Sequence, residues 1–200
     1  GWGHGQTNSR FQNVTQINRS NVDQLDVQWV FKLDGGMSPH SYFTVSKDTL
    51  FVGSQAGTLF ALARDSGCVR WQAKVDSSIR TGLTHGKLTD GRTALFFGTF
   101  EGITYAFDAQ NGQEIWRAKT KVHPFGVNTG TPSYADGKLF VPVSSMELGL
   151  AINPLYGCCT FRGSLVALDA QTGAELWRGY TIDEQPAVSG RHWLFVEEMG

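Results

Sequence analysis

The sequence predicts an all-β protein made of β-propeller blades, which are four-stranded antiparallel sheets. Three observations predict this: one segment recurs three times, apolar runs precede each copy, and the copies are spaced as blades are. The recurring segment runs from a glycine to a tryptophan fourteen residues later: GTLFALARDSGCVRW at 57–71, GITYAFDAQNGQEIW at 102–116 and GSLVALDAQTGAELW at 163–177.

Each copy reads as a strand, a tight turn and a second strand. The alternating residues after the first glycine have the period of a strand with one buried face. The DAQNG and DAQTG stretches are typical of tight turns, because Asp and Asn side chains hydrogen-bond their own backbone and Gly readily adopts a positive φ. The tryptophan then falls on the second strand.

Apolar runs upstream supply a further strand for each copy. They read LFVG at 50–53, LFFG at 95–98 and LFVP at 139–142. From Trp29, successive tryptophans of the pattern follow at intervals of 42, 45 and 61 residues. The first two intervals are typical of four-stranded blades, and the third indicates an insertion at 143–162. Insertions in repeats usually map to one face, often the binding face.

Three copies are fewer than the roughly 4–8 blades of a closed propeller. We therefore expect an incomplete arc of a larger ring. The expected divisions are an N-terminal segment at 1–31 that ends in a closing strand (VQWVF, 27–31), followed by blades at 40–75, 80–120 and 127–181. Residues 182–200 are expected to begin the next blade.

Charge and motif content exclude several functions. The formal net charge is −1, and the 17 Lys and Arg residues do not cluster, which argues against binding to nucleic acid or an anionic membrane. No apolar run approaches the roughly 20 residues of a membrane span. The sequence lacks the CxxCH pattern of c-type haem attachment and the glycine-rich patterns that hold phosphates.

Several stretches resemble one family, the quinoprotein alcohol dehydrogenases. The opening NSRFQNVTQINRSNVDQLDVQWVF at 8–31 is similar to the start of that family. Two copies match its tryptophan-docking motif, whereas the first copy departs from it at Ala63 and Ser66; the matching residues are Ala106, Asp108, Gly112, Trp116, Ala167, Asp169, Gly173 and Trp177. The resemblance implies an eight-bladed propeller that binds pyrroloquinoline quinone (PQQ). The segment YGCCTFRGSLVALDAQTG at 156–173 is most similar to the polyvinyl alcohol dehydrogenase branch.

Cys158 and Cys159 are adjacent, and the residues alone favour two reduced thiols. Neighbouring Cα atoms lie about 3.8 Å apart across a trans peptide, below the roughly 4.4–6.8 Å usual for disulfides. The resemblance implies instead a vicinal disulfide that stacks on one face of PQQ. In the methanol-oxidising branch this pair lies between earlier blades, whereas here it lies within the third. The third cysteine, Cys68, is expected to be a small apolar residue.

Four further residues are candidates through the resemblance. Glu147 matches the glutamate that ligates calcium beside the quinone, although an exposed glutamate is the commoner alternative. Arg80 and Arg162 suit the cofactor carboxylates, because the guanidinium fork is bidentate, or they are surface arginines. His123 would bond a quinone oxygen or move a proton, or else cap a loop.

The implied function is PQQ-dependent oxidation of secondary or polymeric alcohols, such as polyvinyl alcohol. Calcium would be a second cofactor, cytochrome c would accept the electrons, and the cell compartment would be the periplasm. The catalytic base is unknown, because related enzymes place it in later blades. The alternative is a non-catalytic propeller of the same repeat family that serves as an outer-membrane assembly scaffold.

Overall fold

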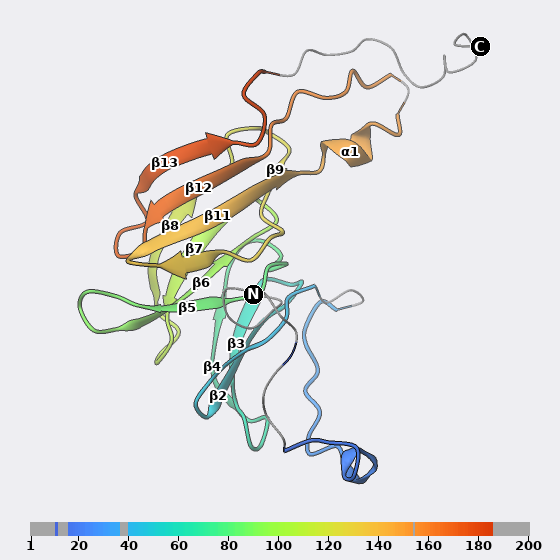
Figure 1. The fold of residues 1–200 in the computed structure, drawn as a ribbon, viewed down its shortest axis with the longest axis vertical. Coiled ribbons are helices and arrows are strands. Elements are labelled where there is room, and N and C mark those ends of the chain that lie inside the picture. Colours follow the sequence, from blue (N-terminus) through green and yellow to red (C-terminus); the bar gives the residue numbers. More distant parts are fainter. Residues whose placement is uncertain (1–10, 12–15, 37–39, 154, 186–200) are drawn as a thin grey trace.

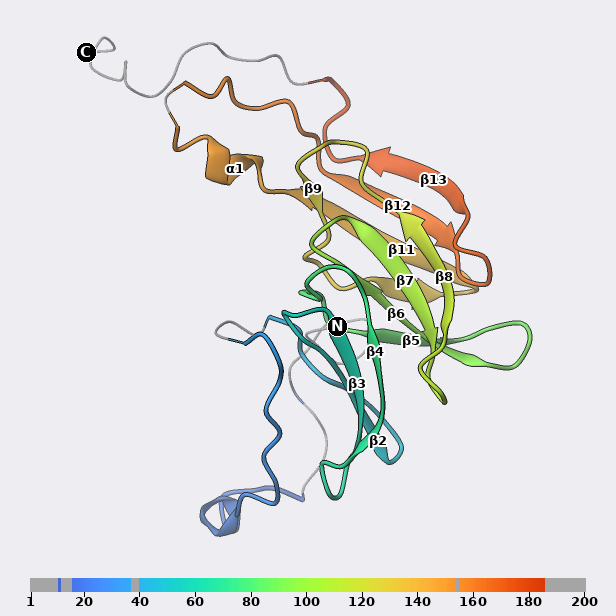
Figure 2. The ribbon, with the colours of Figure 1, turned by 180° about the vertical axis from the view of Figure 1, so that it is seen from behind.

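Three antiparallel sheets follow one another along the chain in this computed structural model, which describes residues 11, 16–36, 40–153 and 155–185. They lie in succession along the longest axis of the molecule (Figures 1 and 2). Each sheet has four consecutive strands in simple up-and-down order. The described residues thus form part of a β-propeller, as the sequence predicts.

The strand bounds repeat from sheet to sheet. The first sheet contains β1 (Thr44–Ser46), β2 (Thr49–Gly53), β3 (Thr58–Ala63) and β4 (Val69–Lys74). The second contains β5 (Thr84–Lys87), β6 (Thr93–Gly98), β7 (Ile103–Asp108) and β8 (Glu114–Lys119). The third contains β10 (Ser133–Ala135), β11 (Lys138–Ser145), β12 (Ser164–Asp169) and β13 (Glu175–Tyr180), with β9 (Gly126–Val127) paired to the end of β11.

Two short helical turns complete the described structure: the 3-10 turn η1 (Val22–Gln24) and the helix α1 (Glu147–Leu150). In the part of the chain that is described, no helix has the length and apolar character needed to cross a bilayer.

The hydrophobic core lies between the sheets. The apolar faces of the first and second sheets meet through Phe51, Leu59, Leu95 and Phe97, among others. The second and third meet in the same way around Phe96, Trp116, Leu139 and Val166. A third, smaller cluster is formed by Val52, Phe60 and Leu62 of the first sheet, with Trp29, Phe31 and Leu33 of the N-terminal segment packed against them.

One tryptophan docks the first blade onto the second, and an equivalent one docks the second onto the third. Trp71 and Trp116 pair with the alanine at the same place in the neighbouring strand, and each pairing is followed by the same irregularity in register. The ring of Trp71 lies against Gly112 and its Nε1–H donates to the carbonyl of Ala109 (3.1 Å). The ring of Trp116 likewise lies against Gly173, and its Nε1–H donates to the carbonyl of Ala170 (3.0 Å). The equivalence of these tryptophans is therefore confirmed.

A second series of contacts links the blades at their innermost strands. The hydroxyl of Thr44, which begins β1, donates to the carbonyl of Leu83 just before β5. Thr84, which begins β5, donates in the same way to the carbonyl of Pro132 just before β10. Each blade is thus held to the next at both its inner and its outer edge.

Residues 25–33 carry no strand assignment. A strand needs a hydrogen-bonded neighbour, and none of the described residues supplies one here, so the closing strand at 27–31 stays a prediction. Trp29 nevertheless keeps the docking geometry, since its ring lies on Gly67 and its Nε1–H donates to the carbonyl of Arg64 (2.8 Å). The predicted blade start at 182–200 lies largely outside the described residues, as do 1–10 and 12–15 of the N-terminal segment.

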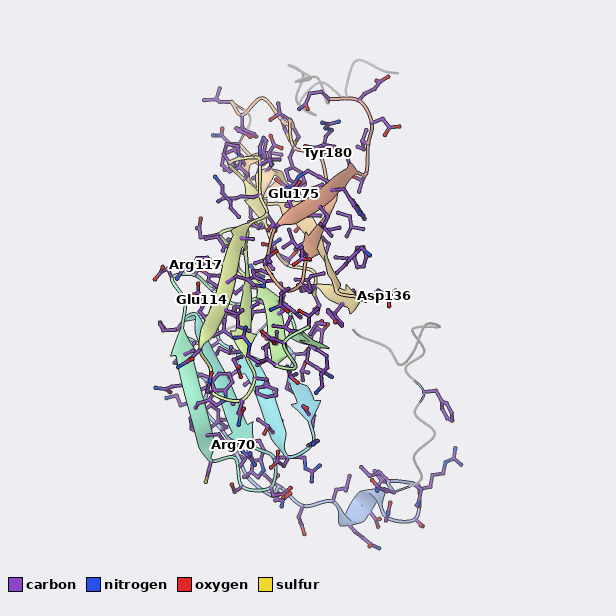
Figure 3. All side chains as sticks on the ribbon, turned by 90° about the vertical axis from the view of Figure 1, so that its left-hand side faces the viewer. Arg70, Glu114, Arg117, Asp136, Glu175 and Tyr180 are labelled. Carbon is purple, nitrogen blue, oxygen red and sulfur yellow. A yellow bond between two sulfur atoms is a disulfide. The ribbon has the colours of Figure 1, made fainter. Side chains whose placement is uncertain are left out.

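The outer strands carry short-range ion pairs at matching places. Glu114 pairs with Arg117 on β8 and Glu175 with Arg178 on β13. Figure 3 shows Arg117 beside Glu114 on its outer strand, with Glu175 on the outer strand of the next blade. The largely exposed Glu114–Arg117 pair contributes little stability, whereas the Arg178 side chain is only 9% exposed.

Candidate functional site

The predicted site residues all lie at one end of the sheets. In an up-and-down sheet, the loop after the second strand and the loop after the fourth strand emerge at the same end. Arg80 follows β4, His123 follows β8, and the stretch from Glu147 to Arg162 connects β11 to β12. The insertion that the sequence predicts therefore extends this end of the third blade, where Figure 1 shows α1 beyond the end of β11.

The structure joins Cys158 and Cys159 in a disulfide, as the family resemblance implies and the residues alone do not. Both cysteines are partly buried and lie near the end of the insertion, four and five residues before Gly163. Cys68 is an exposed free thiol rather than a packed apolar residue.

Glu147 is buried, with 2% of its surface exposed, which excludes the alternative of an exposed glutamate. Its Oε1 accepts hydrogen bonds from the Tyr156 hydroxyl (2.9 Å) and the Thr160 N–H (2.8 Å), and Oε2 accepts from the Phe161 N–H (2.8 Å). Burial alone would raise the pKa of this carboxyl, but the donors from residues 160, 161 and 156 and the nearby His123 lower it below its ordinary value. Glu147 is therefore an ionised carboxylate inside the protein, stabilised by hydrogen bonds from protein donors.

His123 belongs to the same cluster. Its Nε2 lies 3.0 Å from the Thr160 hydroxyl, and its Nδ1 accepts the N–H of Phe125 (3.3 Å). The imidazole packs edge-on against Phe161. Since a backbone N–H can only donate, Nδ1 is the acceptor and the neutral ring carries its proton on Nε2.

Arg162 lies next to this cluster but points elsewhere. Its guanidinium lies 3.8 Å from the centre of the Tyr180 ring and donates to the carbonyls of Asp183 (2.7 Å) and Ile182 (3.4 Å). Arg162 thus fixes the chain that follows β13, and its Nη1 is already hydrogen-bonded there.

Arg80 is separate from the insertion. Its guanidinium lies 5.0 Å from the centre of the Phe100 ring, and its buried Nε has no hydrogen-bond partner among the described residues. The next residue, Thr81, fixes this loop to the end of β6, because its hydroxyl exchanges hydrogen bonds with the backbone of Gly98. An unpaired, buried guanidinium nitrogen on a fixed loop is suited to bind an anion.

The described residues do not fit a calcium site built on Glu147. Calcium takes about 6–8 oxygen ligands, usually including several carboxylates. No group of three or more His, Cys, Asp or Glu residues in the described ranges could hold a metal ion. The oxygens of Glu147 are in addition already bonded to the insertion.

The fit to PQQ is better, although it rests on fewer residues than predicted. The orphaned Nε of Arg80 matches a cofactor carboxylate, and the disulfide offers a compact apolar wall. His123 is already hydrogen-bonded to Thr160, and Arg162 already donates to backbone carbonyls that follow β13. The sequence reasoning missed Thr160, whose only signal is its place directly after the cysteine pair.

Comparison with known proteins finds relatives of the chain as a whole. Residues 10–178 and 100–199 match a family model described as "Outer membrane protein assembly factor BamB". A polyvinylalcohol dehydrogenase of Pseudomonas sp is 40% identical over 94% of the chain and 29% of its own length. A second, from Sphingopyxis sp. (strain 113P3), is 37% identical over 93% of the chain and 29% of its own length.

A solved structure agrees with the fold. The quinohemoprotein alcohol dehydrogenase from Comamonas testosteroni matches with a TM-score of 0.71 and 22% identity, over 86% of this chain and 25% of that one. The chain thus spans less than a third of the length of the relatives that it matches.

Proposed function

Because the chain belongs to the family of PQQ-dependent alcohol dehydrogenases, we propose that it forms one wall of the quinone site in such an enzyme. The Cys158–Cys159 disulfide is the observation that carries the proposal. It lies at the same end of the blades as Arg80, whose buried Nε is left without a partner. A non-catalytic propeller would need neither feature.

Each residue has a separate task in this proposal. Arg80 would bind a carboxylate of PQQ through charge-assisted hydrogen bonds. The Cys158–Cys159 pair would cover one face of the cofactor and exclude water from it. When bound, PQQ would supply the acceptor for the hydride of the alcohol. His123 and Arg162 would support the loops around this position, and the catalytic base is not assigned.

The proposed substrates are secondary or polymeric alcohols, because two of the most similar relatives are named polyvinylalcohol dehydrogenases. Electrons would pass to a cytochrome c, and an oxidised cysteine pair favours the periplasm as the compartment. Calcium is proposed as a cofactor on the family resemblance alone, with ligands outside the described residues.

The alternative is an outer-membrane assembly scaffold, which the description of the matching family model favours. PQQ binding separates the two proposals. We would titrate the full-length protein with PQQ, record the quinone absorption and assay oxidation of a secondary alcohol and of polyvinyl alcohol. The wild type should bind and turn over, the Cys158→Ser/Cys159→Ser variant should be impaired, and the exposed Cys68→Ser control should match the wild type. A wild-type protein that binds no PQQ would contradict the dehydrogenase proposal.

A further inference from the structure

One carboxylate closes the insertion of the third blade on itself. Glu147 is the first residue of α1, immediately after β11, and Thr160 and Phe161 lie shortly before β12. The N–H groups of both residues donate to Glu147, one to each carboxylate oxygen (2.8 Å each). The two ends of the insertion are therefore joined at a single buried side chain.

The hydrogen bonds of Glu147 leave little room for another ligand. A carboxylate offers about four lone-pair positions. Three donors converge on Oε1 of Glu147, namely the Thr160 N–H, the Tyr156 hydroxyl and, at 3.3 Å, the Thr160 hydroxyl. Among the described residues, Oε2 accepts the Phe161 N–H alone. A cation that engaged both carboxylate oxygens would therefore have to displace donors that fix the return of the chain.

Thr160 extends this arrangement to the neighbouring loop. Its Oγ1 lies between Nε2 of His123 (3.0 Å) and Oε1 of Glu147 (3.3 Å). With its proton on Nε2, His123 donates to Thr160, whose hydroxyl then donates to Glu147. The carbonyl of Thr160 accepts a further hydrogen bond from the side chain of Gln185 (2.9 Å). Thr160 is thus held through its N–H, its hydroxyl and its carbonyl.

This anchored residue directly follows the disulfide. We propose that Thr160 and Glu147 form a latch that fixes the position of the Cys158–Cys159 pair, and that Glu147 serves this latch instead of ligating calcium. Thr160 is a positioning residue, because it acts through the cysteines. The relevance of the pair to PQQ rests on the proposed function, whereas the latch itself does not.

The test measures the latch without using PQQ. In the full-length oxidised protein, we would follow reduction of the pair by dithiothreitol, using alkylation and intact mass. Thr160→Val keeps the shape of the side chain but removes the hydroxyl, Thr160→Ser restores it, and Glu147→Gln removes the charge. Glu114→Gln on the outer strand is the matched control. We expect reduction at least fivefold faster in Thr160→Val and Glu147→Gln, and rates within twofold of wild type in Thr160→Ser and the control.

Calcium affinity supplies the second readout. We expect the dissociation constant for calcium, measured by calorimetry, to change less than twofold in Glu147→Gln. A tenfold weaker affinity would overturn the proposal whatever the reduction rate, and so would wild-type reduction kinetics in Thr160→Val. If Glu147→Gln does not fold, the reduction rates of Thr160→Val and Thr160→Ser still test the latch. A protein that reduces as expected but binds no PQQ would refute the proposed function and leave the latch supported.

Discussion

Replacing Gly173 with alanine tests the docking of one blade onto the next. Gly173 has a φ of +76° and lies under the ring of Trp116, where an added Cβ would come within 2.7 Å of the ring atoms Cδ2 and Cε3. Gly137 has a similar φ of +71° in the same sheet, but no atom lies within 4 Å of the position of its Cβ. The two substitutions share the backbone penalty and differ in the contact with Trp116.

The difference in free energy of unfolding can be worked from these contacts. Alanine in the left-handed region costs roughly 1–2 kcal/mol, which is the whole effect expected for Gly137→Ala. In Gly173→Ala the Trp116 ring must also move, at about 1–3 kcal/mol for overpacking. Its hydrogen bond to Ala170 weakens, at about 1 kcal/mol. We expect Gly173→Ala to be less stable than Gly137→Ala by roughly 2–4 kcal/mol.

Urea unfolding of the full-length variants, followed by circular dichroism, measures this difference. Because a protein of several blades can unfold in steps, the transition of each variant would also be followed by tryptophan fluorescence. Stabilities that agree within about 0.5 kcal/mol, the usual scatter of independent substitutions, would refute the docking argument.

Three further predictions concern other contacts. Arg80→Gln should weaken PQQ binding about 10–100-fold, as expected for losing charge-assisted hydrogen bonds, whereas Arg117→Gln on the outer strand should not; an equilibrium PQQ titration compares them. Asp90 binds Gln171 of the next blade, and the arginine bonded to Asp90 lowers its pKa from the ordinary 3.8. The wild type should therefore be more stable than Asp90→Asn at pH values above the ordinary pKa of 3.8 and should lose this advantage as the pH falls below it. Urea midpoints measured against pH for the two proteins would show or contradict this trend. Tyr42→Phe removes a hydroxyl that joins the first blade to the third (2.6 Å) and should cost about 1 kcal/mol by denaturant unfolding.

Local sequence patterns predict the blades well. The turn glycines and docking tryptophans recur at fixed spacing because each turn needs a positive φ and each ring needs a glycine beneath it. The departures Ala63 and Ser66 do not disturb the first blade, because the backbone hydrogen bond from Gly67 to Ala63 matches the one from Gly112 to Asp108. The closing strand at 27–31 is harder to predict, since a strand depends on a neighbour that its own residues do not reveal.

The site is less predictable because its contacts join distant residues. The family resemblance identified the cysteine pair and Glu147, and the residues alone could not. That Glu147 bonds residues thirteen and fourteen positions later follows from how the insertion folds back, which leaves no periodic signal. Thr160 matters through three different partners, and a lone threonine after two cysteines suggests none of them.

The two ends of each blade are under different structural constraints. At the docking end, the glycine in the turn between the third and fourth strands of each blade lies under the ring of an earlier tryptophan (Gly67 under Trp29, Gly112 under Trp71 and Gly173 under Trp116), so altering this turn disturbs an interface. At the opposite end, the loop between the second and third strands has four residues in the first two blades, at 54–57 and 99–102, and eighteen in the third, at 146–163. Lengthening a loop this much costs only about 1.3 kcal/mol of closure entropy. New chemistry can thus be acquired by elongation at one end while the other preserves the architecture, which makes these loops the natural place to graft a different specificity.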